Sequence, residues 1–462
     1  MTQLVKDAVD AILSRGEIYE VGGAVRDRLL TGGSVSADRD YLVTGIPLDD
    51  LIDILKKFGR VDLVGKSFGV IKFTQFEPDT QMTFDITLPR TEFSTGPGHK
   101  DFQVTFDHTL RVEDDLLRRD FTINAMAMSI NTGGIIDPLG GQKDLKDRVL
   151  RIVYPTSFED DPLRMLRGIQ FAARFDFTIE STTFEAMKRN AALIGSVSPE
   201  RIADELNKLL AKAAKPSEGF RLMQQSGILK EILPELELCV DVDQPGPYHK
   251  WNVFEHTLHT IDAARPELKL RMALLFHDVN KPQAKRATED GATFYGHEKM
   301  GARTAKKILQ RLRYSNDFTD EVVTLIDRHM FTTGVTDKGL RRLVRRVGVP
   351  LIFDLLDVRR ADVVGQGMGG KTDDVDKFEA DIRAELERQP PFSVSDLALD
   401  GGAIMELFSI GPGPAIGKIL SHLMERVLDN PELNTTEALT TIAREFYAQG
   451  MPAPDIEEEN NS

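Results

Sequence analysis

The sequence lacks features that mark several classes of protein. Its 462 residues include one cysteine, Cys239, which excludes an intrachain disulfide and is typical of a reducing compartment. No apolar run approaches the ~20 residues that a membrane-spanning helix requires. Residues 1–17 are mixed and amphipathic, unlike the basic and then apolar start of an export signal. We therefore expect the protein to reside in the cytoplasm.

An excess of positive charge is also missing. The formal net charge is −15, whereas proteins that bind long nucleic acids without selectivity usually present a basic surface that neutralises phosphates. Basic residues gather locally at 303–313 and at 341–346. Such runs on an acidic protein suit a compact RNA that is recognised by its shape. The alternative is that each run is the solvated face of a helix.

The length predicts two to four domains. Residues 18–155 alternate short β-rich runs with turns, which predicts an α+β domain with a mostly antiparallel sheet. From about Ser157 onward helical periodicity dominates, and breaks rich in proline and glycine interrupt it. The predicted parts are an α+β domain at 1–156, a helical connector at 157–215, a helical domain at 216–390, a terminal helical piece at 391–450 and a flexible acidic tail at 451–462.

A glycine turn near the start is the strongest local signal. Residues 18–21 predict a strand, Gly22 and Gly23 a tight turn, and residues 24–30 a helix, an arrangement that lets backbone N–H groups approach a phosphate. At the next predicted strand, Asp38 and Asp40 are two positions apart and therefore project from one face. Two such carboxylates beside a phosphate-binding turn suit the two Mg²⁺ ions of phosphoryl or nucleotidyl transfer. The alternative is a turn followed by a solvated acidic loop.

Arginines dominate two later segments. Arg118 and Arg119 offer guanidinium groups to a triphosphate or ribose, and Asn124 follows about one helical turn later. Asp161, Arg164 and Arg167 recur every three residues and are predicted to line one face of a helix.

This Asp–Arg spacing matches the edges of two bases. Cytosine and adenine each present an amino donor beside a ring nitrogen that accepts. A carboxylate only accepts and a guanidinium only donates, so Asp161 and Arg164 together fit CTP and ATP and oppose UTP and GTP. The alternative is an intrahelical ion pair worth only about 0.3–0.5 kcal/mol.

Histidines concentrate in the predicted helical domain, where six of the nine fall between His249 and His329. Their order with nearby carboxylates resembles that of HD-type metal phosphohydrolases. Imidazole and carboxylate groups from several helices suit Mg²⁺, Mn²⁺, Ni²⁺ or iron that activates a water molecule. The candidate ligands are His256, His277, Asp278, His297, His329 and Asp362.

Five motifs in order, at residues 22–27, 38–40, 118–127, 160–167 and 198–206, resemble those of the bacterial/eukaryotic-type CCA-adding tRNA nucleotidyltransferases and their poly(A) polymerase relatives. The resemblance implies a head, neck, body and tail, and the addition of C, C and A to tRNA 3′ ends from CTP and ATP. It implies that Asp38 and Asp40 bind the catalytic Mg²⁺ ions. The implied nucleotide-binding residues are Gly22, Gly23, Arg26, Arg119, Asn124, Asp161, Arg164 and Arg167.

The chain departs from the family pattern at two positions. Asp160 stands where glutamate is frequent, and Gln170 where many members carry arginine. A third carboxylate, Asp85, either joins the catalytic pair or has a structural role.

The alternatives are a poly(A) polymerase, an enzyme that adds only CC or only A, and an HD phosphohydrolase whose head senses nucleotides. Poly(A) polymerase relatives carry strongly basic C-terminal extensions, whereas this chain ends in acidic residues, so CCA addition is favoured over poly(A) synthesis. The resemblance also implies phosphatase and 2′,3′-cyclic phosphodiesterase activity of the HD site on RNA ends.

Overall fold

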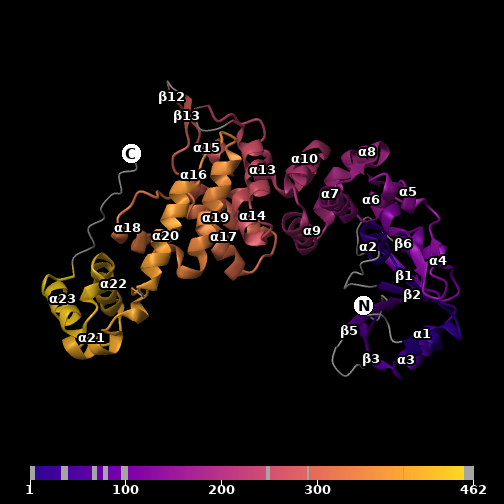
Figure 1. The fold of residues 1–462 in the computed structure, drawn as a ribbon, viewed down its shortest axis with the longest axis horizontal. Helices are drawn as coiled ribbons and strands as arrows, with labels where there is room; N and C mark the ends of the chain where they lie inside the picture. Colours follow the sequence, from indigo (N-terminus) through magenta and orange to yellow (C-terminus); the bar gives the residue numbers. More distant parts are fainter. Residues whose placement is uncertain are drawn as a thin grey trace. The chain divides into compact units, whose positions relative to one another are not determined.

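The computed structural model describes residues 6–32, 40–64, 70–75, 82–94, 102–245, 250–288, 291–388 and 390–451 (Figure 1). The chain divides into two units. The first contains residues 1–240, 266–268 and 307–315, and the second contains the remainder. The predicted domain boundaries near 156, 215 and 390 lie inside these units and stay predictions. Among the described residues, no helix is long and apolar enough to cross a membrane.

A seven-stranded sheet forms the centre of the N-terminal region, which confirms the predicted α+β class. Its strand order is β3-β4-β5-β2-β1-β8-β9, and every neighbouring pair is antiparallel except β2 and β5. The strands are β1 (Glu17–Val21), β2 (Asp40–Thr44), β3 (Gly59–Val64), β4 (Val70–Gln75), β5 (Met82–Thr87), β8 (Ala127–Ser129) and β9 (Ile135–Ile136). A separate hairpin pairs β6 (Arg90–Ser94) with β7 (Phe102–Phe106).

Alternating side chains of β1 bury both faces of this sheet. Ile18 joins a core with α1 (Lys6–Leu13) and α3 (Leu48–Leu55), whereas Tyr19 joins a second cluster with Val112 and Leu116 of α4 (Val112–Leu116). In the first core Phe73 and Phe84 are almost fully buried, and each contributes about 1.5–3 kcal/mol relative to exposure. The sheet is therefore a rigid support for the residues at its strand ends.

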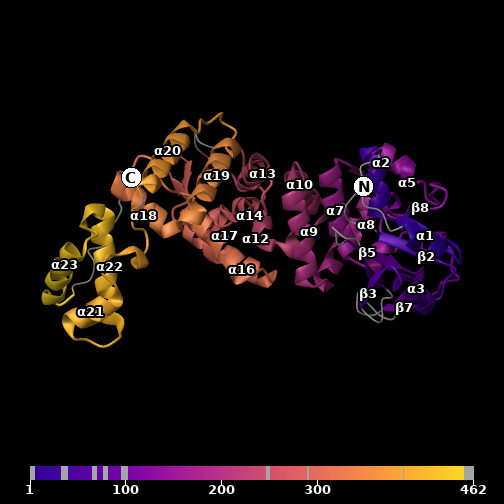
Figure 2. The ribbon, with the colours of Figure 1, turned by 60° about the horizontal axis from the view of Figure 1, so that its bottom comes forward.

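Helices follow the sheet. The first are α6 (Ser157–Asp160), α7 (Leu163–Phe175), α8 (Ser181–Asn190), α9 (Pro199–Lys212) and α10 (Pro216–Ser226). Helix α7 packs against α9 and α10, as Figure 2 shows. The short strand pairs β10 (Val149–Leu150) with β11 (Thr178–Ile179) and β12 (Arg286–Thr288) with β13 (Gly291–Thr293) were not predicted, because two or three residues carry little strand periodicity.

The second unit is mainly helical. Helix α13 (Val253–Ala263) packs closely on α19 (Val349–Gly365), where a Cβ atom on Gly365 would lie 2.9 Å from the backbone nitrogen of Thr260. Around this pair lie α14 (Leu268–Phe276), α16 (His297–Arg311), α17 (Asn316–Arg328), α18 (Asp337–Val347) and α20 (Asp373–Glu387). A further apolar cluster joins α21 (Gly401–Phe408), α22 (Pro414–Asp429) and α23 (Thr436–Ala448).

Candidate active site

A cavity of about 990 Å³ in the first unit collects most of the residues that the N-terminal motifs single out. Asp38 lies outside the described residues. The cavity is lined by Gly22, Gly23, Arg26, Asp40, Arg119, Asn124, Asp161, Arg164 and Arg167, together with Asp85, Arg118, Tyr154 and Arg201. Residues as far apart in the chain as Gly22 and Arg201 therefore share one concave surface.

The turn before α2 (Gly23–Thr31) requires glycine for two reasons. Gly22 has a φ of 70°, which side chains with a Cβ atom rarely adopt. A Cβ atom there would also lie 2.5 Å from Nη1 of Arg119. The missing side chain thus lets the Arg119 guanidinium lie directly against the turn.

Asp40 and Asp85 occupy neighbouring strands at this cavity. Asp40 begins β2 and is in register with Asp85 of β5, across the parallel pair of the sheet. Residues opposite each other on adjacent strands project on the same face. Asp85, for which the sequence allowed either a catalytic or a structural role, therefore lies beside Asp40, a predicted metal ligand.

Asp115 anchors both arginines at the start of the motif at 118–127. This side chain is fully buried, and its oxygens accept from Arg118 at 2.5 Å and from Arg119 at 3.1 Å. Burial alone raises the pKa of the Asp115 carboxyl, but the charges of Arg119 and Arg118 outweigh it and hold the pKa below its ordinary value. The (i, i+3) and (i, i+4) spacing was a signal in the sequence for this anchor.

Arg26 is held by a second network. Its Nη1 donates to Oδ1 of Asn124 at 2.7 Å, and its guanidinium lies over the rings of Phe171 and Phe175 at 5.0 and 4.7 Å. Asn124 donates in turn to Asp120 at 3.0 Å. Burial lowers the pKa of Arg26. Asn124 thus ties the glycine turn to the arginine motif from a short 3₁₀ turn, not from the continuous helix that its spacing suggested.

Asp120 also fixes Arg167. The two side chains form an ion pair at 3.0 Å, in which Asp120 is almost fully buried. Burial raises the pKa of Asp120, and the charge of Arg167 with the hydrogen bond from Asn124 reverses that effect and lowers it. Arg167 therefore lines the cavity in an orientation set by a buried partner 47 positions earlier.

The predicted common helix face of Asp161, Arg164 and Arg167 is wrong for Asp161. Helix α6 ends at Asp160, Asp161 is extended, and α7 begins at Leu163, because Pro162 interrupts the first helix. Oδ1 of Asp161 accepts from the backbone nitrogen of Leu163 at 3.2 Å. Asp161 precedes the helix and is not paired with Arg164.

Arg164 is pinned from several directions. Its Nη1 donates to the Tyr154 hydroxyl at 2.7 Å and to Oγ of Ser157 at 2.8 Å, and its Nη2 donates to the backbone carbonyl of Arg118 at 3.0 Å. A guanidinium has five N–H groups, so these contacts leave two for another acceptor. Arg164 is thus oriented before any ligand binds.

The candidate residues did not include the buried anchors Asp115 and Asp120, nor Tyr154, Ser157 and Arg201. Tyr154 and Ser157 belong to none of the five motifs, and nothing in the sequence near them indicates that their hydroxyls accept from Arg164. Arg201 of α9 lies within the motif at 198–206, but nothing local links it to Asp161, whose Oδ2 it contacts at 2.9 Å.

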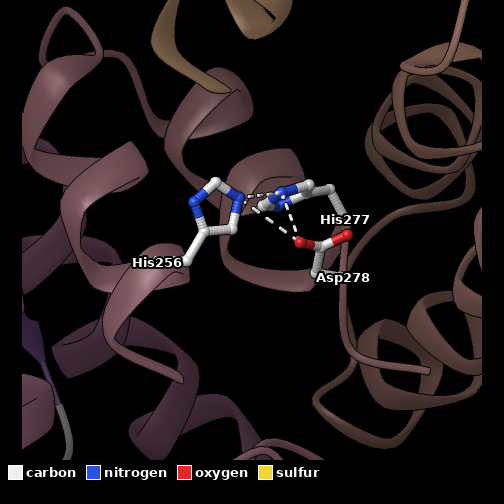
Figure 3. Close-up of side chains that lie close together, drawn as sticks. All are labelled: His256, His277 and Asp278. Carbon is white, nitrogen blue, oxygen red and sulfur yellow. Dashed lines mark hydrogen bonds and ion pairs between the residues drawn. The ribbon is translucent and has the colours of Figure 1, made fainter. Parts of the chain in front are cut away.

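A separate cluster lies in the second unit, where all six predicted histidine and aspartate ligands converge. Figure 3 shows His256, His277 and Asp278 facing one another. The Nε2 atoms of His256 and His277 are 3.3 Å apart, as are those of His297 and His329. Asp362 places Oδ1 3.1 Å from Nε2 of His256.

Asp278 faces two sets of ligands. Its Oδ2 lies 3.4 and 3.2 Å from Nε2 of His256 and His277, while its Oδ1 lies 3.2 Å from Nε2 of His297. The two groups with spacing suited to a metal ion are His256, His277 and Asp278, and Asp278, His297 and His329. Both oxygens are buried, and Oδ2 also forms an ion pair with Nζ of Lys281 at 2.7 Å.

Backbone carbonyls orient three of the rings. Nδ1 of His277, His297 and His329 lies 2.6–2.7 Å from the carbonyl three residues earlier. Donation from Nδ1–H leaves the Nε2 lone pair for a metal ion, which is the usual arrangement behind ligating histidines. The donor set therefore fits a divalent cation.

The charged groups of this cluster shift one another's pKa values in opposite directions. Burial lowers the pKa of His256, but Asp278 and Asp362 reverse this and raise it to about 9. Burial and the neighbouring His277 and His297 lower the pKa of His329 to about 3. Such divergent values among touching groups are typical of functional sites.

Three family models match the chain. "Poly A polymerase head domain" covers residues 18–151, "Probable RNA and SrmB-binding site of polymerase A" covers 176–239, and a tRNA nucleotidyltransferase domain 2 covers 292–443.

Whole proteins match as well. A multifunctional CCA protein of Cupriavidus metallidurans is 36% identical over 344 residues, which are 72% of this chain and 79% of the relative. One from Paraburkholderia phymatum is 33% identical over 414 residues, or 86% and 93% of the two chains. The solved Bacillus stearothermophilus CCA-adding enzyme in complex with CTP superposes with a TM-score of 0.71 over 97% of this chain and 99% of that one; at 23% identity this shows a common fold.

Proposed function

This chain belongs to the family of the multifunctional CCA proteins, and we propose from this premise that it adds C, C and A to the 3′ ends of tRNA, using CTP and ATP without a nucleic-acid template. The observation that carries the proposal is the one cavity that is lined by the glycine turn, Asp40, Asp161 and Arg164. The donor and acceptor groups of Asp161 and Arg164 also predict a preference for CTP and ATP over UTP and GTP.

The nucleotide is bound in parts by different residues. The Gly22–Gly23 turn and Arg119 hold the phosphates or sugar, and Arg26 and Asn124 support them. Asp161 accepts a hydrogen bond from the amino group of cytosine or adenine, and one of the two remaining N–H groups of Arg164 donates to the adjacent ring nitrogen. UTP and GTP present a donor to Arg164 and an acceptor to Asp161, so they are rejected.

Asp38 and Asp40 are the proposed ligands of Mg²⁺. Divalent cations bound there supply charge stabilisation on the phosphate oxygens and lower the pKa of the primer hydroxyl. The contribution of the chain is orientation, because Asp115, Asp120 and Arg201 hold the groups around the triphosphate before binding.

The test is incorporation of each nucleotide, alone and together, into tRNA that ends before CCA, after C and after CC. Completion to CCA with refusal of UTP and GTP is the expected result. An enzyme that stops at CC, or extends only the CC end, belongs to a split pathway. Long A tails identify a poly(A) polymerase instead.

A second activity is favoured by the convergence of six histidine and aspartate side chains. We propose that this HD site binds a divalent transition metal or Mg²⁺ and hydrolyses phosphate monoesters and 2′,3′-cyclic phosphates at RNA ends. A cation bound there activates water for attack on phosphorus. Removing a terminal phosphate exposes the hydroxyl that the transferase extends, so the two activities serve one substrate. We further propose that the protein acts in the cytoplasm.

A further inference from the structure

Two phenylalanine rings of α7 lie against a cationic side chain of the nucleotide cavity. The distance from Cζ of Arg26 to the ring centroid is 5.0 Å for Phe171 and 4.7 Å for Phe175. The two rings stack on each other, with centroids 6.0 Å apart and 29° between their planes. Phe171 is 8% exposed and lines the cavity, whereas Phe175 lies outside the set of lining residues. We call Phe171 and Phe175 the aromatic shelf.

Phe171 also contacts a second arginine of the cavity. Cζ of Arg167 lies 5.8 Å from the centroid of the Phe171 ring. Arg167 belongs to α7 itself, whereas Arg26 belongs to α2, which follows the glycine turn. The faces of a phenyl ring carry partial negative charge and attract guanidinium groups. Phe171 therefore stabilises two cations that come from distant segments and line one cavity.

Polar contacts connect the same two arginines by another route. Arg26 donates to Asn124 at 2.7 Å, and Asn124 donates to Asp120 at 3.0 Å. Asp120 pairs in turn with Arg167 at 3.0 Å. Together with Phe171, these side chains form a closed ring of contacts that joins α2, the motif at 118–127 and α7. Each member of such a network is oriented by two neighbours, so a change at one of them alters the others.

The guanidinium of Arg26 keeps donors for a phosphate. Its Nε donates to Asp27 at 2.8 Å, its Nη1 donates to Asn124, and its Nη2 lies 2.7 Å from Asp27. A guanidinium has five N–H groups, so these contacts leave two. A Cβ atom on Gly23 would lie 3.4 Å from Nη2 of Arg26, which places the guanidinium directly beside the glycine turn. Arg26 is therefore placed to donate to a phosphate that binds at this turn.

The aromatic shelf can orient Arg26 without using its donors. The N–H groups of a guanidinium lie in its plane, so a ring over its face leaves all of them available to acceptors. A second acid in place of the rings would instead occupy donors and compete with a phosphate for them. An aromatic contact is therefore suited to an arginine that has to bind an anionic ligand.

We propose that Phe171 and Phe175 are positioning residues of the nucleotide site. They hold Arg26 at the glycine turn, where it binds the triphosphate of the incoming nucleotide, and Phe171 connects this contact to α7 through Arg167. The proposal rests on the proposed function for the identity of the nucleotide. A different role for Phe171 is to stack on the base. Phe175 separates the two roles, because it contacts Arg26 from outside the cavity.

The test measures binding of CTP to the full-length protein by isothermal titration calorimetry, with Mg²⁺ and without tRNA. The kcat and the KM for CTP are measured separately, during extension of a tRNA that ends before CCA. In Phe171→Leu and in Phe175→Leu the side chain stays apolar but loses its π face. Each variant is expected to weaken CTP binding about fivefold and to raise the KM for CTP by a similar factor, while kcat changes less than about twofold. Phe171→Tyr keeps the π face and is expected to bind CTP within about twofold of the wild type.

Phe184→Leu is the matched control. Nζ of Lys188 lies 5.0 Å from the centroid of the Phe184 ring on α8, and neither residue of this pair lines the nucleotide cavity. This variant is expected to bind CTP like the wild type. In an Arg26→Gln background, Phe175→Leu is expected to cause no further loss of CTP affinity, because both changes act through one guanidinium.

Unchanged CTP binding in Phe175→Leu overturns the inference, and a loss confined to Phe171→Leu shows that this ring stacks on the base instead. An equal loss in Phe184→Leu, or a Phe171→Tyr variant as weak as Phe171→Leu, also overturns it. Failure of the wild-type protein to extend tRNA overturns the proposed function instead, because calorimetry reports nucleotide binding independently of nucleotide addition.

Discussion

Arg201 on α9 donates from Nη2 to Oδ2 of Asp161 at 2.9 Å, across 40 positions of the chain. The second oxygen of Asp161 accepts from the backbone of Leu163. The carboxylate is therefore held on both sides, and its orientation depends on a residue of another helix. Nη1 of Arg201 is buried and has no hydrogen-bond partner among the described residues, so this side chain can still donate to a ligand.

Replacing Arg201 is expected to weaken nucleotide selection. In Arg201→Gln the Asp161 carboxylate loses its charged partner, and kcat/KM for CTP falls about tenfold, while incorporation of UTP falls less. Arg201→Lys restores part of the selectivity because it keeps the charge. Arg221→Gln is the control, since Arg221 pairs with Glu218 outside the cavity. Equal losses for CTP and UTP would mean that Arg201 only stabilises the packing of α9.

The register of Asp40 and Asp85 predicts that both carboxylates act in the transfer step. We expect Asp40→Asn to reduce nucleotide incorporation about 10³-fold, and Asp85→Asn to reduce it by a smaller factor, with unchanged melting temperatures. Asp62→Asn makes the same change on β3, outside the cavity. A lower melting temperature with normal incorporation in Asp85→Asn would assign that residue to the fold alone.

The HD site predicts two separable activities; its residues are His256, His277, Asp278, His297, His329 and Asp362. His277→Ala is expected to lower bound metal and to abolish hydrolysis of 2′,3′-cyclic phosphate ends, because Nε2 of His277 faces both His256 and Asp278. The addition of C and A continues at the normal rate. His259→Ala is the matched control, since His259 lies one turn after His256 and stacks on Trp251. If both activities decline together in His277→Ala, the cluster supports the structure only.

The buried Asp115 predicts a pH-dependent contribution to stability. Its pKa is lower in the folded protein than in the unfolded chain, so its stabilisation is present above the unfolded value of about 3.9 and disappears as the pH falls through the folded value. Asp115→Asn is expected to cost about 3 kcal/mol at pH 7, because two arginines lose a buried partner. Between pH 5 and 3, the free energy of unfolding of Asp115→Asn is then expected to fall less steeply with decreasing pH than that of the wild type. Chemical denaturation across this range measures both effects, and parallel pH curves for the two proteins contradict the assignment.

Local patterns in the sequence were sufficient for the elements that bear the motifs. The strand before Gly22 and the helix after it follow from alternation, glycine and apolar runs, because these signals act between residues that are close in the chain. The α+β class follows from the same signals. The spacing of Asp115 before Arg118 and Arg119 likewise encodes a local ion-pair geometry.

The tertiary structure decided which of these residues meet. Asp161 pairs with Arg201 and not with Arg164, because the chain is extended between α6 and α7 and α9 packs alongside. Asp85 lies beside Asp40 because β2 and β5 are parallel neighbours. The sequence by itself determined the chemical groups and their order along the chain. Which charges are neutralised and which line a cavity depends on contacts between distant segments, because an ion pair forms only where packing brings its partners within a few ångströms.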